Sequence, residues 1–338
     1  MKHWARRLVP VRARRWFDHR FGLRRRQRWI ASRPNSGTDP VTEFDLVGLV
    51  SAWAEQDVIG ATVANLLRQG CDRVLVIDND GPDDSVAEAV AAGAVLTRTF
   101  STDRYSAARV NEVANEVIAE HSGAARADHV WWLLADSDEF PHGPTGLTVR
   151  DYLGRLDRAF RVVGARTFDH YPSTRPHYVP GYHPLDFQLL CAEHLGPACR
   201  QGHWKHPLVR QDRGQALVRP THGSHMARSD GEMVEPAQPI FVHHFRFRDE
   251  AATRARTEAA EARGPHWGGF SGRYLEGVRT AEWPHLDAVY DGRWDQLPPN
   301  ELGPAATPRP WSDQVSPADA GVARWYSPES LQAAIEAD

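Results

Sequence analysis

Three carboxylates follow one another within four positions of the chain, at Asp136, Asp138 and Glu139. They come directly after the apolar run 130–135, Val-Trp-Trp-Leu-Leu-Ala, which is typical of a strand buried on both faces of a parallel sheet. Burying like charges together costs free energy unless something neutralises them, and a divalent cation that bridges to phosphate oxygens is one solution. The spacing of Asp136 and Asp138 therefore favours a site for Mn²⁺ or Mg²⁺. The alternative is a solvated acidic turn that only ends a strand.

The segments around this turn alternate between apolar runs and helical spacing. They predict strands at 44–50, 73–78, 94–98, 130–135 and 161–166, and helices at 58–68, 86–92, 106–121 and 149–156. This rhythm predicts an α/β fold with a mostly parallel sheet flanked by helices. In such sheets ligands bind outside the carboxyl ends of the strands, where the three carboxylates would lie. Later in the chain, alternation predicts a strand at 240–248, and Asp249 is expected to cap a helix running to about 263.

The composition is that of a soluble globular protein. The 338 residues are 41% hydrophobic and 25% charged. No apolar run approaches the ~20 residues that a membrane span needs, and the N-terminus lacks the apolar region of a secretory signal. The three cysteines have no metal-binding or redox spacing, so we expect reduced thiols and a cytoplasmic location.

The charge is distributed unevenly between the ends of the chain. Residues 1–33 contain Lys2 and eleven arginines against one acid, a net charge of +11, whereas the whole chain has −4, which leaves −15 for the remainder. Arginine interleaved with Trp and Phe suggests contact with an anionic membrane surface, which would place the protein peripherally at the inner face of the membrane. The alternative is a disordered basic tail. The acidic remainder disfavours nucleic acid as a partner.

These patterns divide the chain into four parts. We expect a basic arm at 1–33, a linker at 34–43 and a catalytic domain at 44–263. The part from 264 to 338 would be a C-terminal extension with a Pro-rich linker and short helices, the last of them near 328–335.

Three features in this order resemble glycosyltransferases of the family 2 type, which have the fold called glycosyltransferase A. They are the strand ending Asp78-Asn79-Asp80, the segment Asp136-Ser137-Asp138-Glu139-Phe140, and the late segment His244-Phe-Arg-Phe-Arg248. The similarity spans roughly residues 44 to 256 and fits best the variant that reads D-x-D-E-F. It implies transfer of a hexosyl group from a nucleotide diphosphate sugar to an acceptor hydroxyl, with Mn²⁺ or Mg²⁺ as cofactor. A glycan or lipid-linked acceptor would suit the arginine-rich arm.

The resemblance also implies roles for individual residues. The metal ligands would be Asp136 and Asp138, and the candidates to bind the nucleotide sugar are Glu55, Asp78, Asn79, Arg109, Asn111, Lys205, His244 and Arg248. Several of these have a simpler reading: Asp78 as a turn former, and Arg109 and Asn111 as surface residues of a helix. Lys205 is one of only two lysines in the chain, a fact that genome composition would explain equally well.

The third metal ligand and the general base are the least determined roles. His225 and His244 compete for the metal position that this fold often takes from late in the chain; we favour His225 and place His244 with Arg248 near the diphosphate or acceptor. An inverting transfer, which we expect, needs a carboxylate to accept the proton of the acceptor hydroxyl, and the candidates are Glu139 and Asp169. A retaining enzyme would need no such base.

Two other functions are alternatives to a transferase. A metal-dependent phosphohydrolase of nucleotide sugars would employ the same carboxylates and histidines. A non-catalytic scaffold with this fold, recruited to the membrane by its arm, would employ none of them. The sequence disfavours a dinucleotide-dependent enzyme, because no G-x-G-x-x-G follows the first strand, and it contains no P-loop.

Overall fold

The computed structural model describes residues 30–102, 106–172, 176–194, 205–221, 223–262, 284–294 and 307–321. The strands are β1 (Ala31–Arg33), β2 (Asp45–Ala52), β3 (Arg73–Asp78), β4 (Val95–Thr99), β5 (His129–Asp136), β6 (Glu139–His142), β7 (Val162–Tyr171), β8 (Leu190–Glu193), β9 (Lys205–Asp212), β10 (Arg219–Thr221), β11 (Met226–Arg228), β12 (Val234–Pro236), β13 (Ile240–His244) and β14 (Arg309–Pro310). The α-helices are α2 (Ile59–Arg68), α3 (Ser85–Ala91), α4 (Ala107–Ala124), α5 (Val149–Leu153), α6 (Glu250–Ala262), α8 (Pro284–Tyr290) and α9 (Pro317–Ala320), and short 3-10 helices lie at Pro184–Asp186 and Trp311–Asp313.

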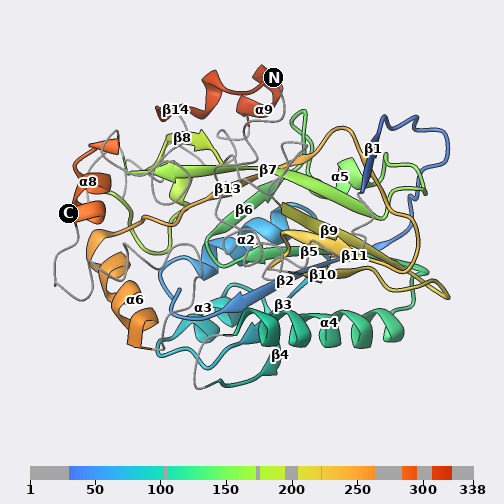
Figure 1. Ribbon diagram of the computed structural model, residues 1–338, viewed down its shortest axis with the longest axis horizontal. Helices are drawn as coiled ribbons and strands as arrows, with labels where there is room; N and C mark the ends of the chain where they lie inside the picture. Colours follow the sequence, from blue (N-terminus) through green and yellow to red (C-terminus); the bar gives the residue numbers. More distant parts are fainter. Residues whose placement is uncertain are drawn as a thin grey trace, which may run out of the picture.

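One large sheet organises the molecule (Figure 1). Its strand order is β14-β8-β7-β9-β5-β2-β3-β4, and β13 pairs with both β6 and β7. The strands β4, β3, β2 and β5 are mutually parallel, whereas β9 runs antiparallel between β5 and β7. The expected α/β fold with a largely parallel sheet flanked by helices is confirmed, and this arrangement is consistent with the glycosyltransferase A fold.

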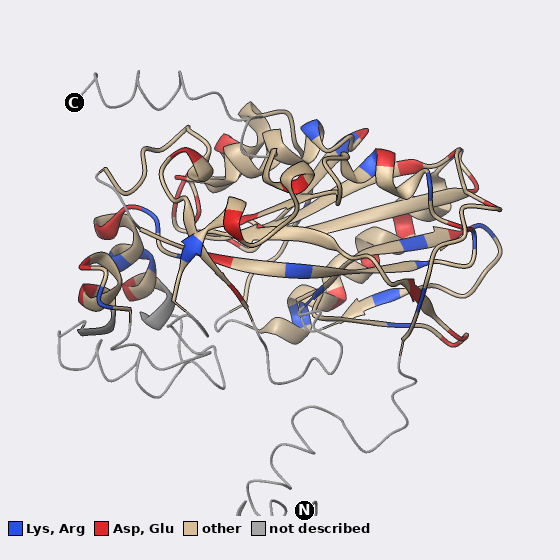
Figure 2. Ribbon diagram, turned by 90° about the horizontal axis from the view of Figure 1, so that it is seen from above, with Lys and Arg blue, Asp and Glu red and all other residues tan. Residues whose placement is uncertain are grey.

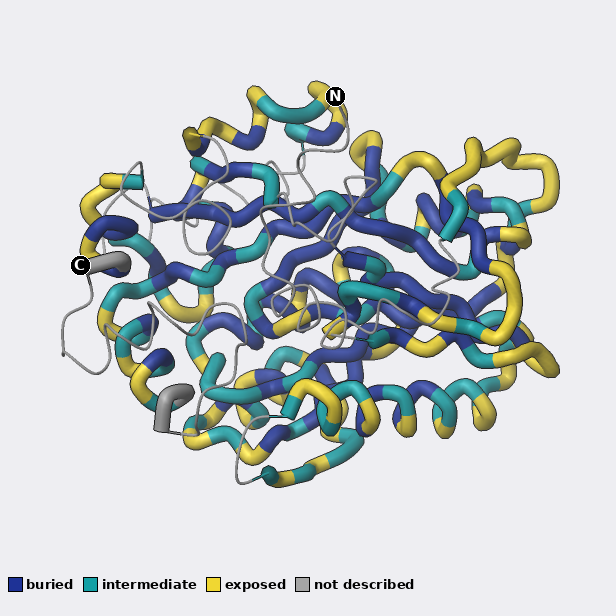
Figure 3. Tube along the Cα trace, in the orientation of Figure 1, coloured by how far each residue is buried: buried dark blue, intermediate teal, exposed yellow. Residues whose placement is uncertain are grey.

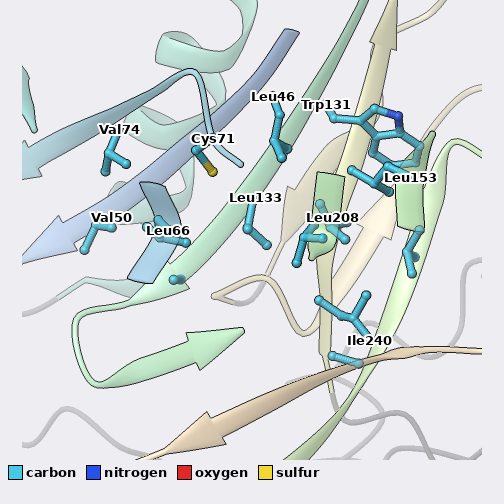
Figure 4. Close-up of a cluster of buried hydrophobic side chains, with 14 of the residues drawn as sticks. Leu46, Val50, Leu66, Cys71, Val74, Trp131, Leu133, Leu153, Leu208 and Ile240 are labelled. Carbon is cyan, nitrogen blue, oxygen red and sulfur yellow. The ribbon is translucent and has the colours of Figure 1, made fainter. Parts of the chain in front are cut away.

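The parallel strands β2, β3 and β5 bury both faces, which explains their nearly uninterrupted apolar sequences. Along β2, Leu46 and Val50 pack into one core cluster, and Val47 and Leu49 pack into another. Figure 4 shows the first cluster, which contains Leu66 of α2 together with side chains of β2, β3, β5 and β9. The helix α4 covers the opposite face with its buried residues and exposes its other side (Figure 3). The sheet is therefore the rigid element from which the loops at its edges extend.

The N-terminal boundary of the folded body differs from the expected one. Residues 31–33 form β1, which pairs in parallel with β12, and the following segment is anchored because Ser36 and Asp39 donate backbone hydrogen bonds to Asp157. The basic arm therefore ends before Ala31, and residues 34–43 are held against the body by hydrogen bonds that composition does not reveal. No helix of the described residues is both long and apolar enough to span a bilayer.

Three expected elements also differ in extent. The strand expected at 161–166 continues to Tyr171, so Asp169 lies inside β7 rather than beyond it. The strand expected at 240–248 ends at His244. Between 166 and 240, where the sequence predicts no strand, the structure has the central strand β9. The buried pair of Arg210 with Asp212 interrupts its apolar pattern. The short helix expected near 328–335 lies outside the described residues.

A close backbone approach after β6 provides a test of this packing. A Cβ atom on Gly143 would lie 2.5 Å from the carbonyl oxygen of Thr148 and 2.7 Å from that of Leu147. We expect Gly143→Ala to lower the free energy of unfolding by about 1–3 kcal/mol, as overpacking typically does. Gly123→Ala in α4, where nothing lies within 4 Å, is the matched control and should stabilise by up to about 1 kcal/mol. Urea denaturation measures both, and equal stabilities of the two variants would contradict the described packing.

Candidate active site

The carboxyl edge of the sheet has a topological switch point between β2 and β5. From β2 the chain continues to β3 and β4 on one side, and β5 then returns to the other side of β2. In the two ladders Asp78 pairs with Ala52, and Asp136 pairs with Ser51, so Asp78 and Asp136 flank the end of β2. Open α/β sheets bind ligands in the crevice at such a point.

The helix α2 holds the acidic turn after β5 in place. The hydroxyl of Thr62 donates a hydrogen bond to the carbonyl oxygen of Ser137. The amide of Asn65 donates to the carbonyl oxygen of Pro141 at 3.0 Å, and the Ser137 hydroxyl donates to the Ser51 carbonyl at 2.8 Å. Because Thr62 and Asn65 are buried polar residues on a helix, these bonds satisfy them and fix the turn against β2.

Lys205, the first residue of β9, neutralises two of the three carboxylates. Its Nζ lies 2.5 Å from Asp136 Oδ2 and 2.6 Å from Glu139 Oε1. Burial alone would lower the pKa of Lys205, but the charges of Asp136 and Glu139 outweigh it and raise that pKa above its usual range. Burial raises the pKa of Glu139, and the charge of Lys205 lowers it only in part. The side chain of Asp136 is 54% exposed whereas that of Glu139 is 2% exposed, so only Asp136 of this group faces solvent.

The third carboxylate, Asp138, meets His244. In the sheet His244 of β13 pairs with Glu139 of β6 on one side and with Asp169 of β7 on the other. Its Nδ1 lies 2.7 Å from Asp169 Oδ1, and its Nε2 lies 3.5 Å from Asp138 Oδ2. Burial would lower the pKa of His244, but Asp138 and Asp169 raise it to about 10.

Asp138 also lies near two arginines of the C-terminal part of the site. Arg248 Nη1 and Arg256 Nη1 are 3.7 Å and 3.8 Å from Asp138 Oδ2. Burial alone would raise the pKa of Asp138, but the positive charge of His244, followed by those of Arg248 and Arg256, holds it well below its usual range. Asp138 is therefore ionised at neutral pH.

The same arginines bind the loop that follows β2. Arg248 is buried and forms a bidentate pair with Asp57, with Nε–Oδ2 and Nη2–Oδ1 distances of 2.6 Å and 2.9 Å. Glu55 pairs with Arg248 and also accepts two hydrogen bonds from Arg256 Nη1, at 2.7 Å and 2.8 Å. The sequence predicts that Glu55 and Arg248 contact the nucleotide sugar. In the structure Glu55 and Arg248 belong to an ionic network that joins the β2 loop to the segment after β13, and their contact with a nucleotide sugar stays a prediction.

The remaining nucleotide-sugar candidates occupy two places. Asp78 and Asn79 end β3 at the switch-point edge, where Asp78 accepts a hydrogen bond from the backbone of Gly81, so both the turn and the binding interpretation of Asp78 stay open. Arg109 lies on the surface of α4 and pairs with Glu112 at 2.7 Å, as the surface-residue alternative expected. Asn111 accepts a hydrogen bond from the backbone of Gly223 and so links α4 to the turn between β10 and β11.

His225 lies in that turn and not in the contact with Asp138. The turn is attached to β9, because the backbone of His206 donates to the Ser224 carbonyl at 2.7 Å. Within the described ranges, no three His, Cys, Asp or Glu side chains converge to hold a metal ion, so Asp136, Asp138 and His225 do not form such a group. The imidazole that contacts Asp138 is that of His244, the other histidine considered for the metal position.

Four site residues were missed by sequence reasoning. Asp57, Thr62, Asn65 and Arg256 all act through contacts with residues far away in the chain. The buried polar pair on α2 has a sequence signal: Thr62 and Asn65 interrupt an otherwise apolar helix face at a spacing of three residues. The other two have none.

The sequence matches no protein-family model, and no curated protein matches it. Similar solved structures include glucosyl-3-phosphoglycerate synthase from Mycobacterium tuberculosis in complex with Mn²⁺, uridine diphosphate and glucosyl-3-phosphoglycerate, at 16% identity over 66% of this chain and 81% of that chain, with a TM-score of 0.32. The same enzyme with Mg²⁺ and uridine diphosphate has 15% identity over 66% of this chain and 80% of that chain, with a TM-score of 0.31. A mycobacterial protein has 17% identity over 65% of this chain and 73% of that chain, with a TM-score of 0.30. At such values the likeness carries no inference about activity, which has to come from the site itself.

The Lys205 contacts predict a pH-dependent loss of stability. Lys205→Met leaves Glu139 buried without its counter-charge, which should lower the free energy of unfolding by about 3–5 kcal/mol near pH 8. Because the pKa of Glu139 is raised in the folded state, the folded protein binds the proton at a higher pH than the unfolded chain does. A protonated Glu139 needs no counter-charge, so the loss of unfolding free energy in the variant should shrink towards pH 5. Chemical denaturation at several pH values measures this.

The matched control is Arg213→Met, which breaks an exposed pair with Asp128 and should cost no more than about 1 kcal/mol at any pH. A Lys205→Met deficit as small as that of the control, or one that grows on acidification, would contradict the described role of Lys205.

Proposed function

We propose that the protein is a glycosyltransferase that moves a sugar from a nucleotide diphosphate sugar to an acceptor hydroxyl with the help of a divalent cation. One observation carries the proposal: the acidic turn Asp136–Glu139 and the imidazole of His244 meet at the carboxyl edge beside the topological switch point. Carboxylates and an imidazole gathered there suit a nucleotide diphosphate, whose own charge requires a cation between it and the acidic turn.

The residues present fit such a cation. Asp138 offers an ionised carboxylate, and His244 Nε2, 3.5 Å from it, becomes a ligand once the cation displaces its proton. Asp136 lies two residues away with its side chain half exposed. Mg²⁺ and similar ions are commonly held by one or two carboxylates together with substrate phosphates, so a protein cage of three converging ligands is not required. Asp138 and His244 would hold the ion, with Asp136 beside it. When bound, it would act as a Lewis acid that stabilises the charge on the departing diphosphate.

The remaining residues divide between binding and support. We assign Asp78 and Asn79, at the end of β3, to the nucleoside. Lys205 holds Asp136 and thereby orients the exposed end of the acidic turn. Arg248 and Arg256 fix the loop after β2 and keep Asp138 ionised.

Neither expected base is suited to deprotonate an acceptor. Glu139 is buried and paired with Lys205. Asp169 uses one oxygen for His244 and the other for His194 at 2.6 Å, and its pKa is well below the usual range because Arg246 and the two histidines outweigh its burial. We therefore assign both carboxylates to support rather than to proton transfer. NMR of the product anomer distinguishes an inverting from a retaining course.

A binding experiment tests the proposal directly. The purified protein is titrated with Mn²⁺ and, one at a time, the diphosphates of uridine, guanosine, adenosine, cytidine and thymidine, with calorimetry as the measurement. We expect one nucleotide to bind in the presence of Mn²⁺ and to lose affinity when EDTA is added. Absence of binding for all five would favour a scaffold. Hydrolysis of the matching nucleotide sugar without acceptor, as fast as transfer, would favour a phosphohydrolase.

Substitution of the two aspartates gives a sharper prediction. Asp136→Asn and Asp138→Asn should each lower metal-dependent turnover of the nucleotide sugar by at least about 100-fold, because the ion supplies several kcal/mol of transition-state stabilisation and each 1.4 kcal/mol is tenfold. Asp128→Asn, which alters an exposed carboxylate in the pair with Arg213, is the control. Thermal unfolding shows that the variants are folded, and full activity of the double variant would overturn the proposal.

We further propose that the basic arm brings the enzyme to an anionic membrane, where a lipid-linked or glycan acceptor would be reached. The part of the arm before β1 contains Lys2 and ten arginines against the single acid Asp18. In contrast, acidic and basic residues are interspersed over the described body (Figure 2), which has no comparable run of one sign. A polybasic segment gains binding energy from each Lys or Arg near an anionic lipid surface.

Deletion of residues 1–29 tests this role while leaving β1 intact. Flotation with phosphatidylserine vesicles should recover the full chain, and recovery should fall as salt is raised because the attraction is screened. The shortened chain should stay unbound, and vesicles of phosphatidylcholine alone should bind neither. Undiminished binding of the shortened chain to the anionic vesicles would refute a role for the arm.

A further inference from the structure

Asp169 lies next to the proposed cation ligand in the sheet. In the ladder between β7 and β13 its register partner is His244, which pairs on its other side with Glu139. Residues directly opposite each other on neighbouring strands have adjacent side chains on the same face. The contact between the Asp169 carboxylate and the His244 ring is therefore set by strand register rather than by a flexible loop.

The hydrogen bond between these residues determines which ring nitrogen of His244 is available. A carboxylate only accepts hydrogen bonds, so the Nδ1 atom at 2.7 Å from Asp169 Oδ1 must carry a hydrogen. Before a cation binds, the His244 ring is charged and carries a hydrogen on both nitrogens. A cation at Nε2, the atom directed at Asp138, would displace that hydrogen as a proton and leave the hydrogen on Nδ1 in place. The opposite tautomer would place an N–H where the cation is proposed to bind.

The second oxygen of Asp169 is engaged by another imidazole. His194 Nδ1 lies 2.6 Å from Asp169 Oδ2, and the side chains of both residues are 9% exposed. Arg246 Nη2 is 3.9 Å from Oδ1. His194 and Arg246 therefore fix the Asp169 carboxylate in addition to His244. The ring of His244 cannot turn without breaking its charge-assisted hydrogen bond with Asp169.

We propose that Asp169 is a positioning residue that holds His244 in the tautomer with Nε2 free for a cation, and that it thereby favours Mn²⁺ over Mg²⁺. The proposal rests on the proposed function, because it assumes that a cation binds at Asp138 and His244. A carboxylate behind a ligating imidazole orients the ring and raises its basicity. An imidazole ligand helps Mn²⁺ more than Mg²⁺, which binds nitrogen poorly and prefers oxygen.

Metal titration of the full chain separates this role from general structural support. Electron paramagnetic resonance of Mn²⁺, alone and with uridine diphosphate, gives the affinity, and competition with Mg²⁺ gives the selectivity. Asp169→Asn retains the shape but offers one acceptor oxygen to two imidazoles. We expect it to weaken Mn²⁺ binding by about 10- to 100-fold, the usual effect of losing such a partner, and to weaken Mg²⁺ binding less.

Two further variants complete the comparison. His244→Gln removes the proposed ligand and should weaken Mn²⁺ binding at least as much. Glu193→Gln removes a carboxylate of the neighbouring strand β8, where Glu193 pairs with Arg166 at 2.8 Å and does not contact His244. This matched control should bind Mn²⁺ as the unaltered chain does.

The outcomes distinguish the two proposals. If the unaltered chain binds no Mn²⁺ with or without the nucleotide, or if His244→Gln binds as tightly as the unaltered chain, the proposed cation site is wrong. If His244→Gln weakens binding but Asp169→Asn changes neither the affinity nor the ratio of Mn²⁺ to Mg²⁺ affinities, only the role of Asp169 is refuted.

A measurement on the unaltered chain covers the case in which Asp169→Asn does not fold. Nitrogen-15 NMR of histidine-labelled protein, saturated with Mg²⁺ and uridine diphosphate, reports the tautomer of each ring. The His244 signals are identified by their absence from the His244→Gln spectrum. A proton on Nδ1 supports the proposal, and a proton on Nε2 overturns it.

Discussion

The site depends on the burial of negative charge at the end of a buried strand. Asp138 and Glu139 are removed from water by the packing that makes β5 a central strand, and isolated carboxylates there would cost several kcal/mol each. The chain compensates with cations from other strands and segments. Lys205 begins β9 and pairs with Glu139, while His244 ends β13 and contacts Asp138. Charge neutralisation at this edge therefore links strands that are far apart in sequence.

This neutralisation also fixes the loop beside the switch point. Arg248 is buried between the loop after β2 and the segment after β13, and its pairs with Glu55 and Asp57 hold the two together. Removing one partner of such a buried pair leaves an uncompensated charge, so these contacts constrain the loop more strongly than exposed ion pairs would. Of the three carboxylates in the acidic turn, Asp136 is the most exposed to solvent.

Local sequence pattern was sufficient for much of the fold and for the centre of the site. The runs that form β2, β3 and β5 are apolar because both faces of a parallel sheet are covered, so they could be recognised without any tertiary information. The position of Asp136 and Asp138 directly after such a run placed them at the carboxyl edge. In contrast, β9 escaped detection, since Arg210 and Asp212 are buried as a pair and their polarity masks a central strand.

The sequence by itself determined the order of the strands along the chain, the acidic turn and the set of histidines and arginines from which partners are drawn. Only the tertiary structure decided which partner each carboxylate has. His244 rather than His225 meets Asp138, because β13 inserts between β6 and β7 in a register that aligns Glu139, His244 and Asp169. Register between strands separated by many residues depends on the packing of the whole sheet, and no local spacing encodes it.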